Sequence, residues 1–323
     1  MLKHCWIAAS VLLAFGLTGP ASAQDVKYPD HVVKIVVPYP PGGTTDVVGR
    51  IIADKLNARL GQPFIIDNRP GAAGMIGSDV VAKSQGDGYT ILMGSVANTT
   101  IPAVYAHVPY DLKRDLIPLC QVISIPNFMV VAADSPYKTV ADVIAAAKAA
   151  PGKLSFASSG AGASPHLSGE LFKVMTGTDM LHVPYKGSGP AQVDLMGGRV
   201  TLMFDNAALS QVKGGTLRAL AVSTPKRTAA APNIPTVAEA GVPGYGVSSW
   251  YGLWVPKGTP QPVINLLNKN IAEIFEDKAI KDKILELGGD TEVACGDKFS
   301  AFIDTELTKW SDLVKKANIK IDN

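Results

Sequence analysis

The residues best suited to binding chemistry form one short loop, Pro38-Tyr39-Pro40-Pro41-Gly42-Gly43-Thr44-Thr45-Asp46. Its two glycines lack a Cβ atom, so a ligand can approach the backbone closely. Thr44, Thr45 and Asp46 are all residue types that begin helices as N-caps. Free N–H groups at the start of a helix, together with the helix dipole, favour an anion. The loop therefore predicts a cradle for a carboxylate or phosphate, and the alternative is an ordinary strand-to-helix connection.

The segments on either side predict how the loop is held. Residues 32–37 are apolar and mostly β-branched, which indicates one buried strand. After the loop, apolar residues recur at helical spacing as far as Leu60, and Gly61 fits a helix stop. The loop therefore lies at the carboxyl end of a strand, where open α/β sheets bind ligands.

The second half of the chain repeats this arrangement. Leu154 to Ala157 predicts a short strand, and the small-residue loop Ser158 to His166 leads into a helix that closes at Gly177. If the two halves face each other, the two loops form a cleft with hydrogen-bond donors on both walls. Other polar groups follow strands and are candidates for the same cleft: the segment Gly94 to Thr100, Lys186, and the pair Asp205-Asn206.

Catalytic and cofactor motifs are incomplete throughout the sequence. Gly160-Ala161-Gly162 begins like a dinucleotide fingerprint, but Pro165 occupies the third glycine position. Ser135 to Lys138 matches S-x-x-K without the S-D-N and K-T-G elements of β-lactamases, and no G-x-S-x-G elbow occurs. His166 and Glu170 could share a metal on one helix, but no third ligand is indicated. We therefore expect no catalytic residues, no metal and no cofactor.

The N-terminus has the pattern of a secretory signal peptide. Lys3 and His4 precede the apolar run Cys5 to Leu17, and Ala21-Ser22-Ala23 is a cleavage signal before Gln24. Removing it leaves 323 − 23 = 300 residues with 30 − 1 = 29 basic and 28 acidic side chains, a net charge of +1. This near-neutral balance argues against nucleic-acid binding and against a dedicated binder of anionic membranes. Cys120 and Cys295 could form a bridge in an oxidising compartment, although two separate buried thiols are the favoured expectation.

Strand–loop–helix units with short connections predict an α/β fold with mainly parallel sheets, and 300 residues predict two domains. The apolar stretch Leu119 to Ala133 is expected to cross between domains, and Thr224-Pro225-Lys226 to mark the return. The expected division is a signal peptide at 1–23, the first lobe at 24–124, the second lobe at 125–224, and a return to the first lobe at 225–323. A C-terminal amphipathic helix is predicted from about Lys298 to Lys316.

The opening loop also resembles the signature loop of the Bug-type periplasmic solute receptors, the binding components of tripartite tricarboxylate transporters. The resemblance continues in family order over essentially the whole mature chain. Its further segments are Asn68-Arg69-Pro70-Gly71-Ala72, Ser158-Ser159-Gly160-Ala161-Gly162, His166-Leu167-Ser168-Gly169-Glu170, Val183-Pro184-Tyr185-Lys186-Gly187, Met203-Phe204-Asp205-Asn206 and Trp250-Tyr251-Gly252-Leu253.

The resemblance implies a two-lobed, clamshell periplasmic-binding-protein fold of type II with its ligand between the lobes. It implies that backbone N–H groups and ordered waters at the Gly-Gly loop hold a carboxylate. The ligand-binding residues carried over from the first lobe are Tyr39, Gly42, Gly43, Thr44, Ser95 and Asn98. Those carried over from the second lobe are Ser158, Ser159, Gly160, His166, Tyr185, Lys186, Gly187 and Asp205.

The sequence therefore predicts a monomeric periplasmic receptor that binds a small carboxylate and delivers it to integral-membrane transporter subunits. Two alternatives stay open. One is a receptor of the same fold that reports to a membrane sensor kinase, and the other is a periplasmic α/β enzyme acting on a carboxylated metabolite. The absence of a coherent nucleophile–base pair or metal set counts against the enzyme.

Overall fold

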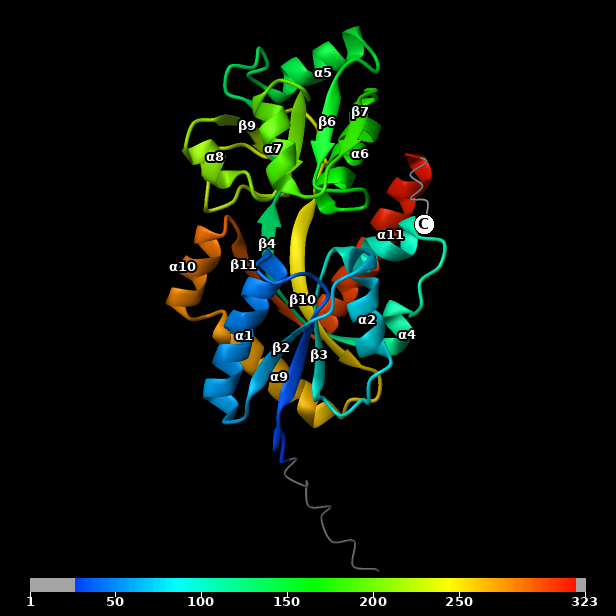
Figure 1. Cartoon of the computed structure of the whole chain (residues 1–323), viewed down its shortest axis with the longest axis vertical. Helices are drawn as coiled ribbons and strands as arrows, with labels where there is room; N and C mark the ends of the chain where they lie inside the picture. Colours follow the sequence, from blue (N-terminus) through cyan, green and yellow to red (C-terminus); the bar gives the residue numbers. More distant parts are fainter. Residues whose placement is uncertain (1–26, 318–323) are drawn as a thin grey trace, which may run out of the picture.

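The computed structural model describes residues 27–317, so the expected signal segment 1–23 lies outside the described residues. Figure 1 shows two lobes stacked along the long axis of the molecule, joined by the strands β4 and β10. Each lobe has its own sheet with helices packed around it. This arrangement confirms the predicted two-lobed α/β fold.

The first lobe is built on a six-stranded sheet with the strand order β11-β4-β10-β3-β1-β2. Its strands are β1 (Val33–Val37), β2 (Phe64–Asn68), β3 (Thr90–Ser95), β4 (Leu116–Pro126), β10 (Ser248–Pro256) and β11 (Asp290–Cys295). Its helices are α1 (Thr44–Leu60), the 3-10 turn η1 (Ala72–Gly74), α2 (Met75–Ala82), α3 (Ala97–Val104), α4 (Leu112–Asp115), α9 (Gln261–Ile274), α10 (Lys278–Glu286) and α11 (Asp297–Lys316).

The second lobe is built on a five-stranded sheet with the order β7-β6-β8-β5-β9. Its strands are β5 (Phe128–Ala132), β6 (Ser155–Ser158), β7 (Leu181–Pro184), β8 (Leu202–Asp205) and β9 (Leu217–Val222). Its helices are α5 (Val140–Ala149), α6 (Ser164–Thr176), α7 (Ser188–Met196) and α8 (Leu209–Lys213).

Both sheets are mixed rather than mainly parallel. The strands β1, β2 and β3 pair in parallel, and so do β6, β7 and β8. β10 pairs antiparallel with β3 and β4, and β5 with β8 and β9, because β10 and β5 each enter their sheet from the other lobe. The edge strand β11 also pairs antiparallel with β4.

The predicted crossing at 119–133 is confirmed, but it is two strands, β4 and β5, that meet at Asn127. This residue is fully buried, and its side-chain amide donates to the hydroxyls of Ser164 and Ser168. The return crossing comes later than predicted, at β10 rather than at Thr224-Pro225-Lys226. Residues 225–247 still contact the second lobe, because Thr236 bridges to Val222 and the Tyr245 hydroxyl donates to the Ser168 carbonyl. The predicted boundary at 124 lies next to the first crossing, whereas the predicted boundary at 224 precedes the observed return at β10.

The edge strand β11 was not predicted, and it carries a disulfide. Cys295 bonds to Cys120 of β4, which is its partner in the strand register. The expectation of two separate thiols was therefore wrong. Cys295 lies in the strand that the sequence analysis did not anticipate, so nothing placed it beside Cys120.

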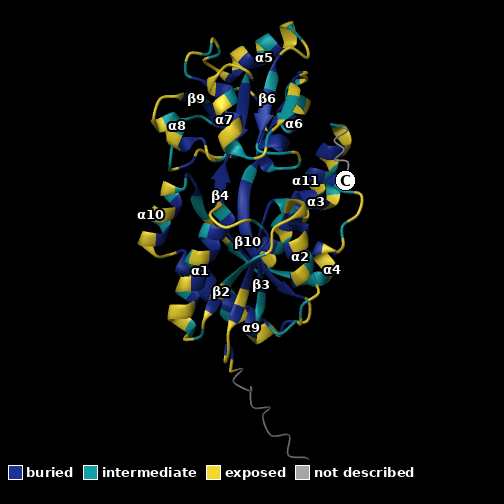
Figure 2. Cartoon of the chain, in the orientation of Figure 1, coloured by how far each residue is buried: buried dark blue, intermediate teal, exposed yellow. Residues whose placement is uncertain are grey.

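Apolar side chains at helical spacing hold α1 against the first sheet. Val48, Ile52 and Leu56 are fully buried, and Gly61 ends the helix in a left-handed conformation, as the sequence predicted. Figure 2 shows the same division across the molecule, with buried strands inside and exposed positions on the outer helix faces. The predicted C-terminal helix is confirmed as α11. Among residues 27–317, no helix has both the length and the apolar composition needed to cross a membrane.

Candidate functional site

A cavity of about 490 Å³ lies between the lobes, on the face of β10 that carries Ser249 and Tyr251. First-lobe residues on its wall are Tyr39, Pro40, Pro41, Gly43, Thr44, Thr45, Ser95, Val96, Ala97, Ser249 and Tyr251. Second-lobe residues on its wall are Ser159, Gly162, Ala163, Ser164, Pro165, Gly187, Ser188 and Asn206. We call this cavity the front cleft.

Four helices begin at the wall of the front cleft. Their first residues, Thr44 of α1, Ala97 of α3, Ser164 of α6 and Ser188 of α7, all line it. None of these four helix starts is capped by the side chain of its N-cap residue. Side-chain caps do occur at α4, α5 and α10, and none of those cap residues lines the cleft. The cleft thus gathers the partial positive charge of several helix N-termini, which favours an anion.

The start of α1 offers the fullest set of donors. Its first N–H groups, those of Thr44, Thr45 and Asp46, have no intrahelical acceptor and no side-chain cap. The other starts offer less, because α6 and α7 have the prolines Pro165 and Pro190 in their first turns, and proline has no N–H. In α3 the first N–H already donates to Ser95 Oγ, at 3.3 Å. An anion in the cleft therefore gains most at α1.

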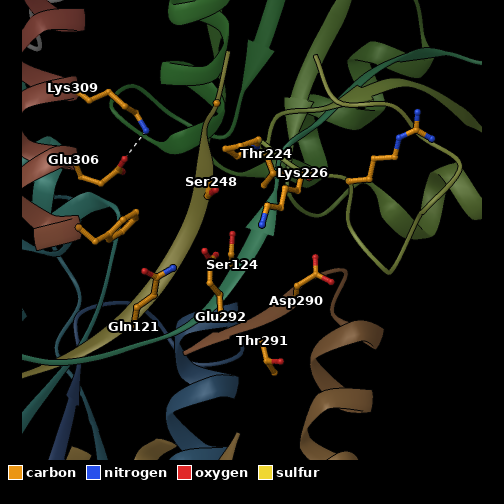
Figure 3. A pocket seen from close by; sticks show the side chains of 14 residues that line it. Gln121, Ser124, Thr224, Lys226, Ser248, Asp290, Thr291, Glu292, Glu306 and Lys309 are labelled. Carbon is orange, nitrogen blue, oxygen red and sulfur yellow. Dashed lines mark hydrogen bonds and ion pairs between the residues drawn. The ribbon is translucent and has the colours of Figure 1, made fainter. Parts of the chain in front are cut away.

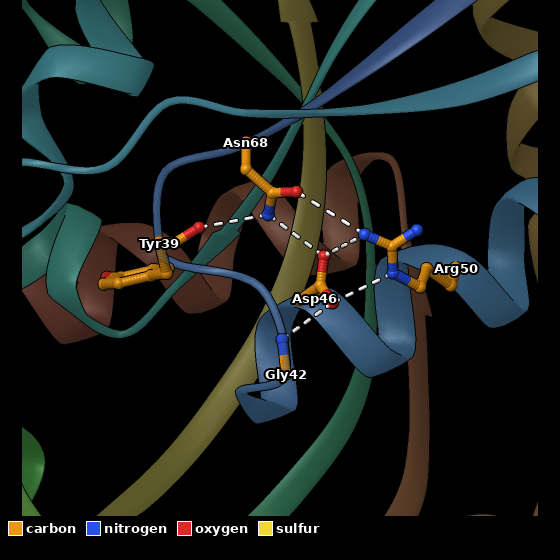
Figure 4. Close-up of polar contacts among 5 residues, drawn as sticks. All are labelled: Tyr39, Gly42, Asp46, Arg50 and Asn68. Atoms are coloured by element: carbon orange, nitrogen blue, oxygen red, sulfur yellow. Dashed lines mark hydrogen bonds and ion pairs between the residues drawn. The ribbon is translucent and has the colours of Figure 1, made fainter.

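A buried carboxylate holds the loop before α1 in place (Figure 4). Asp46 accepts from the Gly42 N–H, from Arg50 and from the Asn68 side chain, at 2.9–3.0 Å. Asn68 also donates to the Tyr39 carbonyl, so β2 is tied to the loop. The hydrogen bonds from Arg50, with those from the Gly42 N–H and Asn68, lower the pKa of Asp46 to about 2. The side chains of Asp46 and Asn68 thus position the loop and do not line the cleft.

The two glycines of this loop have different roles. Gly42 has φ +90°, a conformation that favours glycine, and its N–H is taken by Asp46. Gly43 is the N-cap, has an extended backbone at φ −78°, and lines the cleft. A side chain at Gly43 would therefore occupy cleft volume without straining the backbone. The sequence analysis grouped both glycines as direct contacts, and the structure separates them.

No Asp, Glu, Lys, Arg or His side chain lines the front cleft among the described residues. The side-chain donors there are hydroxyls and one amide, including those of Tyr39 and Tyr251. The Tyr39 hydroxyl lies 3.0 Å from Ser95 Oγ. Burial raises the pKa of Tyr39 far above its usual value and that of Tyr251 to about 12, so both hydroxyls keep their protons at neutral pH.

In the second lobe, the loop before α6 uses most of its donors internally. The Gly160 N–H donates to Ser158 Oγ, the Gly162 N–H to His166 Nδ1, and the Ala163 N–H to the Gly160 carbonyl. His166 is buried and stacks on His182, with ring centroids 3.9 Å apart. Because these donors are already used, the loop forms part of the cleft wall and is not a second anion-binding site.

The structure sorts the predicted site residues into three groups. Those that line the front cleft are Tyr39, Gly43, Thr44, Ser95, Ser159 and Gly187. Those that lie behind its wall and hold it are Gly42, Asn98, Ser158, His166 and Asp205. Gly160 lines a neighbouring cavity, the Tyr185 hydroxyl donates to Asp194, and Lys186 is exposed and does not line the cleft.

Sequence reasoning missed the cleft residues of β10. Ser249 and Tyr251 point into the front cleft, and Ser249 Oγ contacts the Ser164 hydroxyl and the Asn206 amide. The sequence analysis gave Trp250-Tyr251-Gly252-Leu253 only as a segment of the family resemblance, and the alternation of side chains along a strand could have identified one face of it as ligand-facing. Alternation alone does not tell which of the two faces that is.

A second cavity, of about 390 Å³, lies on the opposite face of β10 (Figure 3). Ser248 lines this back cavity, while its neighbour Ser249 lines the front cleft. Its wall carries charges of both signs: Lys226, Arg227 and Lys309 against Asp290, Glu292 and Glu306. Several are already paired, as Glu306 is with Lys309 and Arg227 with Glu239. This balance gives the back cavity no preference for an anion.

Comparisons with known proteins show which family and fold the chain resembles. The sequence model described as "Tripartite tricarboxylate transporter family receptor" matches residues 48–319. Protein BugT of Bordetella pertussis is 38% identical over 314 residues, covering 95% of this chain and 94% of the relative. The structure of R. palustris Rpa4515 with adipate has a TM-score of 0.81 at 38% identity, covering 91% of this chain and all of the other. The structure of MatC from Rhodopseudomonas palustris with bound malate has a TM-score of 0.75 at 27% identity, covering 89% and 100%.

Proposed function

Because the chain belongs to the tripartite tricarboxylate transporter receptor family, we propose that it binds a small carboxylate and delivers it to a transporter of this type. Receptors of this family are periplasmic. The predicted signal peptide, cleaved near Ala23–Gln24, supports the same compartment for this chain. The integral-membrane subunits of the transporter are its proposed partners.

One observation carries the carboxylate assignment: the uncapped start of α1 opens into an interlobe cleft lined only by neutral groups. Hydrogen bonds from neutral donors to a carboxylate are charge-assisted and stronger than those to a neutral acceptor. A cationic ligand would find no counter-charge among the described cleft residues. A neutral ligand would forgo the charge-assisted hydrogen bonds that a carboxylate gains from these N–H groups.

The proposed ligand contacts follow from this arrangement. The carboxylate lies at the N–H groups of Thr44, Thr45 and Asp46, with Gly43 giving it close access. The hydroxyls of Tyr39, Ser95 and Tyr251 surround the rest of the ligand from the first lobe, and Ser159, Ser164, Ser188 and Asn206 from the second. Because both lobes contribute, ligand binding favours the closed clamshell.

A thermal-shift screen of small carboxylates, with adipate and malate included, tests the proposal. A ligand at 100 times its dissociation constant stabilises the folded protein by about 2.7 kcal/mol, a readily measured increase in Tm. A receptor also leaves its ligand chemically unchanged, so long incubation should return it stoichiometrically. Stabilisation by amines or sugars and by no carboxylate overturns the ligand class, and protein-dependent turnover overturns the receptor.

A further inference from the structure

A smaller cavity, of about 240 Å³, adjoins the front cleft between α3 and the loop before α6. The two cavities share five wall residues, Tyr39, Ala97, Ser159, Gly162 and Ala163. The rest of the wall comes from Ala73, Thr100, Ile101, Val104, Tyr105, Gly160 and Ala161. We call it the side chamber.

The wall of the side chamber is mainly aliphatic side chains and hydrogen-bonded backbone, and its polar side chains are hydroxyls, including those of Tyr105 and Ser159. Ile101 and Val104 present buried aliphatic side chains, and the Thr100 hydroxyl donates within α3 to the Ala97 carbonyl. On the opposite wall, the N–H groups of Gly162 and Ala163 donate to acceptors in their own segment. No charged side chain lines the chamber among the described residues. An apolar group entering it would lose water without separating any polar pair.

The backbone that closes one side of the chamber is strained. Ala72 and Ala73 have φ values of +46° and +56°, a left-handed conformation that non-glycine residues rarely adopt. Ala73 lines the chamber, and its carbonyl accepts from the Tyr39 hydroxyl at 3.4 Å. Conformations of this kind persist where the surrounding structure enforces them, and they cluster at ligand clamps.

We propose that the ligand is a carboxylate with an uncharged hydrocarbon tail, and that this tail lies in the side chamber. The inference rests on the proposed function, since the carboxylate is the group held at the start of α1. Tyr39 stands at the junction, because it lines both cavities and its hydroxyl contacts both Ser95 and Ala73. A second carboxylate in the chamber would be buried away from any cation, which is strongly unfavourable.

Calorimetric titration of the full mature chain with propanoate, butanoate, pentanoate and hexanoate tests the inference. Each methylene removed from water should tighten binding roughly fourfold. Citrate should bind more weakly than hexanoate, because it carries further charges and no hydrocarbon tail. Propanoate is the reference compound of the series, since it carries the carboxylate and almost no tail.

Two variants locate the tail. Ala161→Leu places a larger side chain at an exposed wall position outside the left-handed region, so it should fold normally and shorten the chamber. It should abolish the gain from butanoate to hexanoate and leave propanoate binding within twofold. Ala106→Leu, also exposed but outside the chamber wall, is the matched control and should keep the full gain.

The outcomes separate the two proposals. If propanoate binds and added methylenes change nothing, the side-chamber inference is overturned and the carboxylate receptor stands. A methylene gain that survives in Ala161→Leu also overturns it, because the tail then lies elsewhere. If no carboxylate of the series or of the wider screen binds, the proposed function itself fails. Circular dichroism of both variants confirms that they are folded.

Discussion

The front cleft and the back cavity share β10 as a common wall and use opposite chemistry. In the front cleft, Ser249 and Tyr251 meet helix N-termini and hydroxyls, with no charged side chain among the described residues of the wall. In the back cavity, Ser248 shares the wall with three acidic and three basic side chains. The region with the most charged side chains therefore has balanced charge, and the neutral region is the one for which we propose a preference for an anion. Helix starts and backbone donors determine this preference, because they are oriented by the fold and remain free of internal partners.

The difference also concerns pH. The donors of the front cleft are N–H groups, serine and threonine hydroxyls, an amide, and tyrosines whose pKa is raised by burial. A receptor built this way keeps its affinity wherever its ligand stays ionised.

Of the variants proposed here, Gly43→Val should weaken ligand affinity the most. The new side chain occupies the place where the carboxylate approaches α1, and the extended backbone of Gly43 accommodates valine. Loss of one or two charge-assisted hydrogen bonds, each worth about 1.5–3 kcal/mol, weakens affinity by roughly tenfold to ten-thousandfold. Calorimetry with the carboxylate that binds most tightly in the screen measures this loss of affinity.

The matched control for Gly43→Val is Ala58→Val, which adds the same side chain at an exposed position near the other end of α1. Affinity within twofold of the wild type is expected for this control. A folded Gly43→Val protein that binds as tightly as the wild type would remove the α1 cradle from the account.

The adjacent residues Ser248 and Ser249 test whether the two faces of β10 differ in function, with a smaller expected change in affinity. Ser249→Ala removes a hydroxyl of the front cleft that contacts Ser164 and Asn206, and affinity should fall roughly fivefold, about the value of one net hydrogen bond. Ser248→Ala removes the neighbouring hydroxyl on the other face and should leave affinity unchanged. Equal losses in both variants would mean that the two faces of β10 are not functionally distinct.

Removing single positive charges should have almost no effect. Lys226 lines the back cavity and Lys186 is exposed outside the front cleft, so neither faces the proposed carboxylate. Replacing either lysine with alanine should change the dissociation constant by less than twofold at physiological salt. A tenfold loss on removing Lys186 would show that a charge pair holds the ligand and that backbone donors do not dominate.

Ligand affinity and folding stability should depend on pH differently. Affinity for an ionised carboxylate should stay constant from about pH 7 to 9, since the described cleft residues do not titrate there. Stability should behave differently at acid pH. Burial lowers the pKa of His166 to about 3 and that of His182 to about 4, with Lys173 also opposing their protonation.

The sign of this effect follows from proton binding. Below about pH 6.5 the unfolded chain protonates these histidines while the folded chain does not, so the free energy of unfolding falls as pH decreases toward the folded pKa values. Thermal unfolding from pH 8 to 4 checks the trend, and a His182→Gln variant should flatten it. An unchanged slope in that variant would assign the acid sensitivity to other groups.

Much of the fold could be predicted from local sequence patterns. Apolar spacing identified α1 and α11, and the Pro/Gly loop identified the start of α1 as the candidate anion site. Patterns of this kind are local, since each reflects the burial of one face of one element. The edge strand β11 was missed, and with it the disulfide between Cys120 and Cys295, because pairing across 175 residues leaves no local pattern.

The site was predicted less completely, for a related reason. Residue types told which side chains are polar, but not which way they point. Asp205 and Asn98 look like ligand contacts after strands, yet both are buried and support the wall through hydrogen bonds to Ser188 and to the Ser95 N–H. Ser249 was overlooked within an apolar strand. Distinguishing a contact from a support requires the packing of both lobes.

The most direct test of the central claim compares a carboxylate with its uncharged isostere on the wild-type protein. The tightest carboxylate of the screen and its matched primary amide have nearly the same shape, so their difference in affinity reports the preference of the cleft for negative charge. If uncapped helix N–H groups hold the ligand, the amide should bind roughly 30- to 100-fold more weakly by calorimetry, the loss expected when two charge-assisted hydrogen bonds become neutral ones. Equal affinity for the two compounds would contradict the anion cradle.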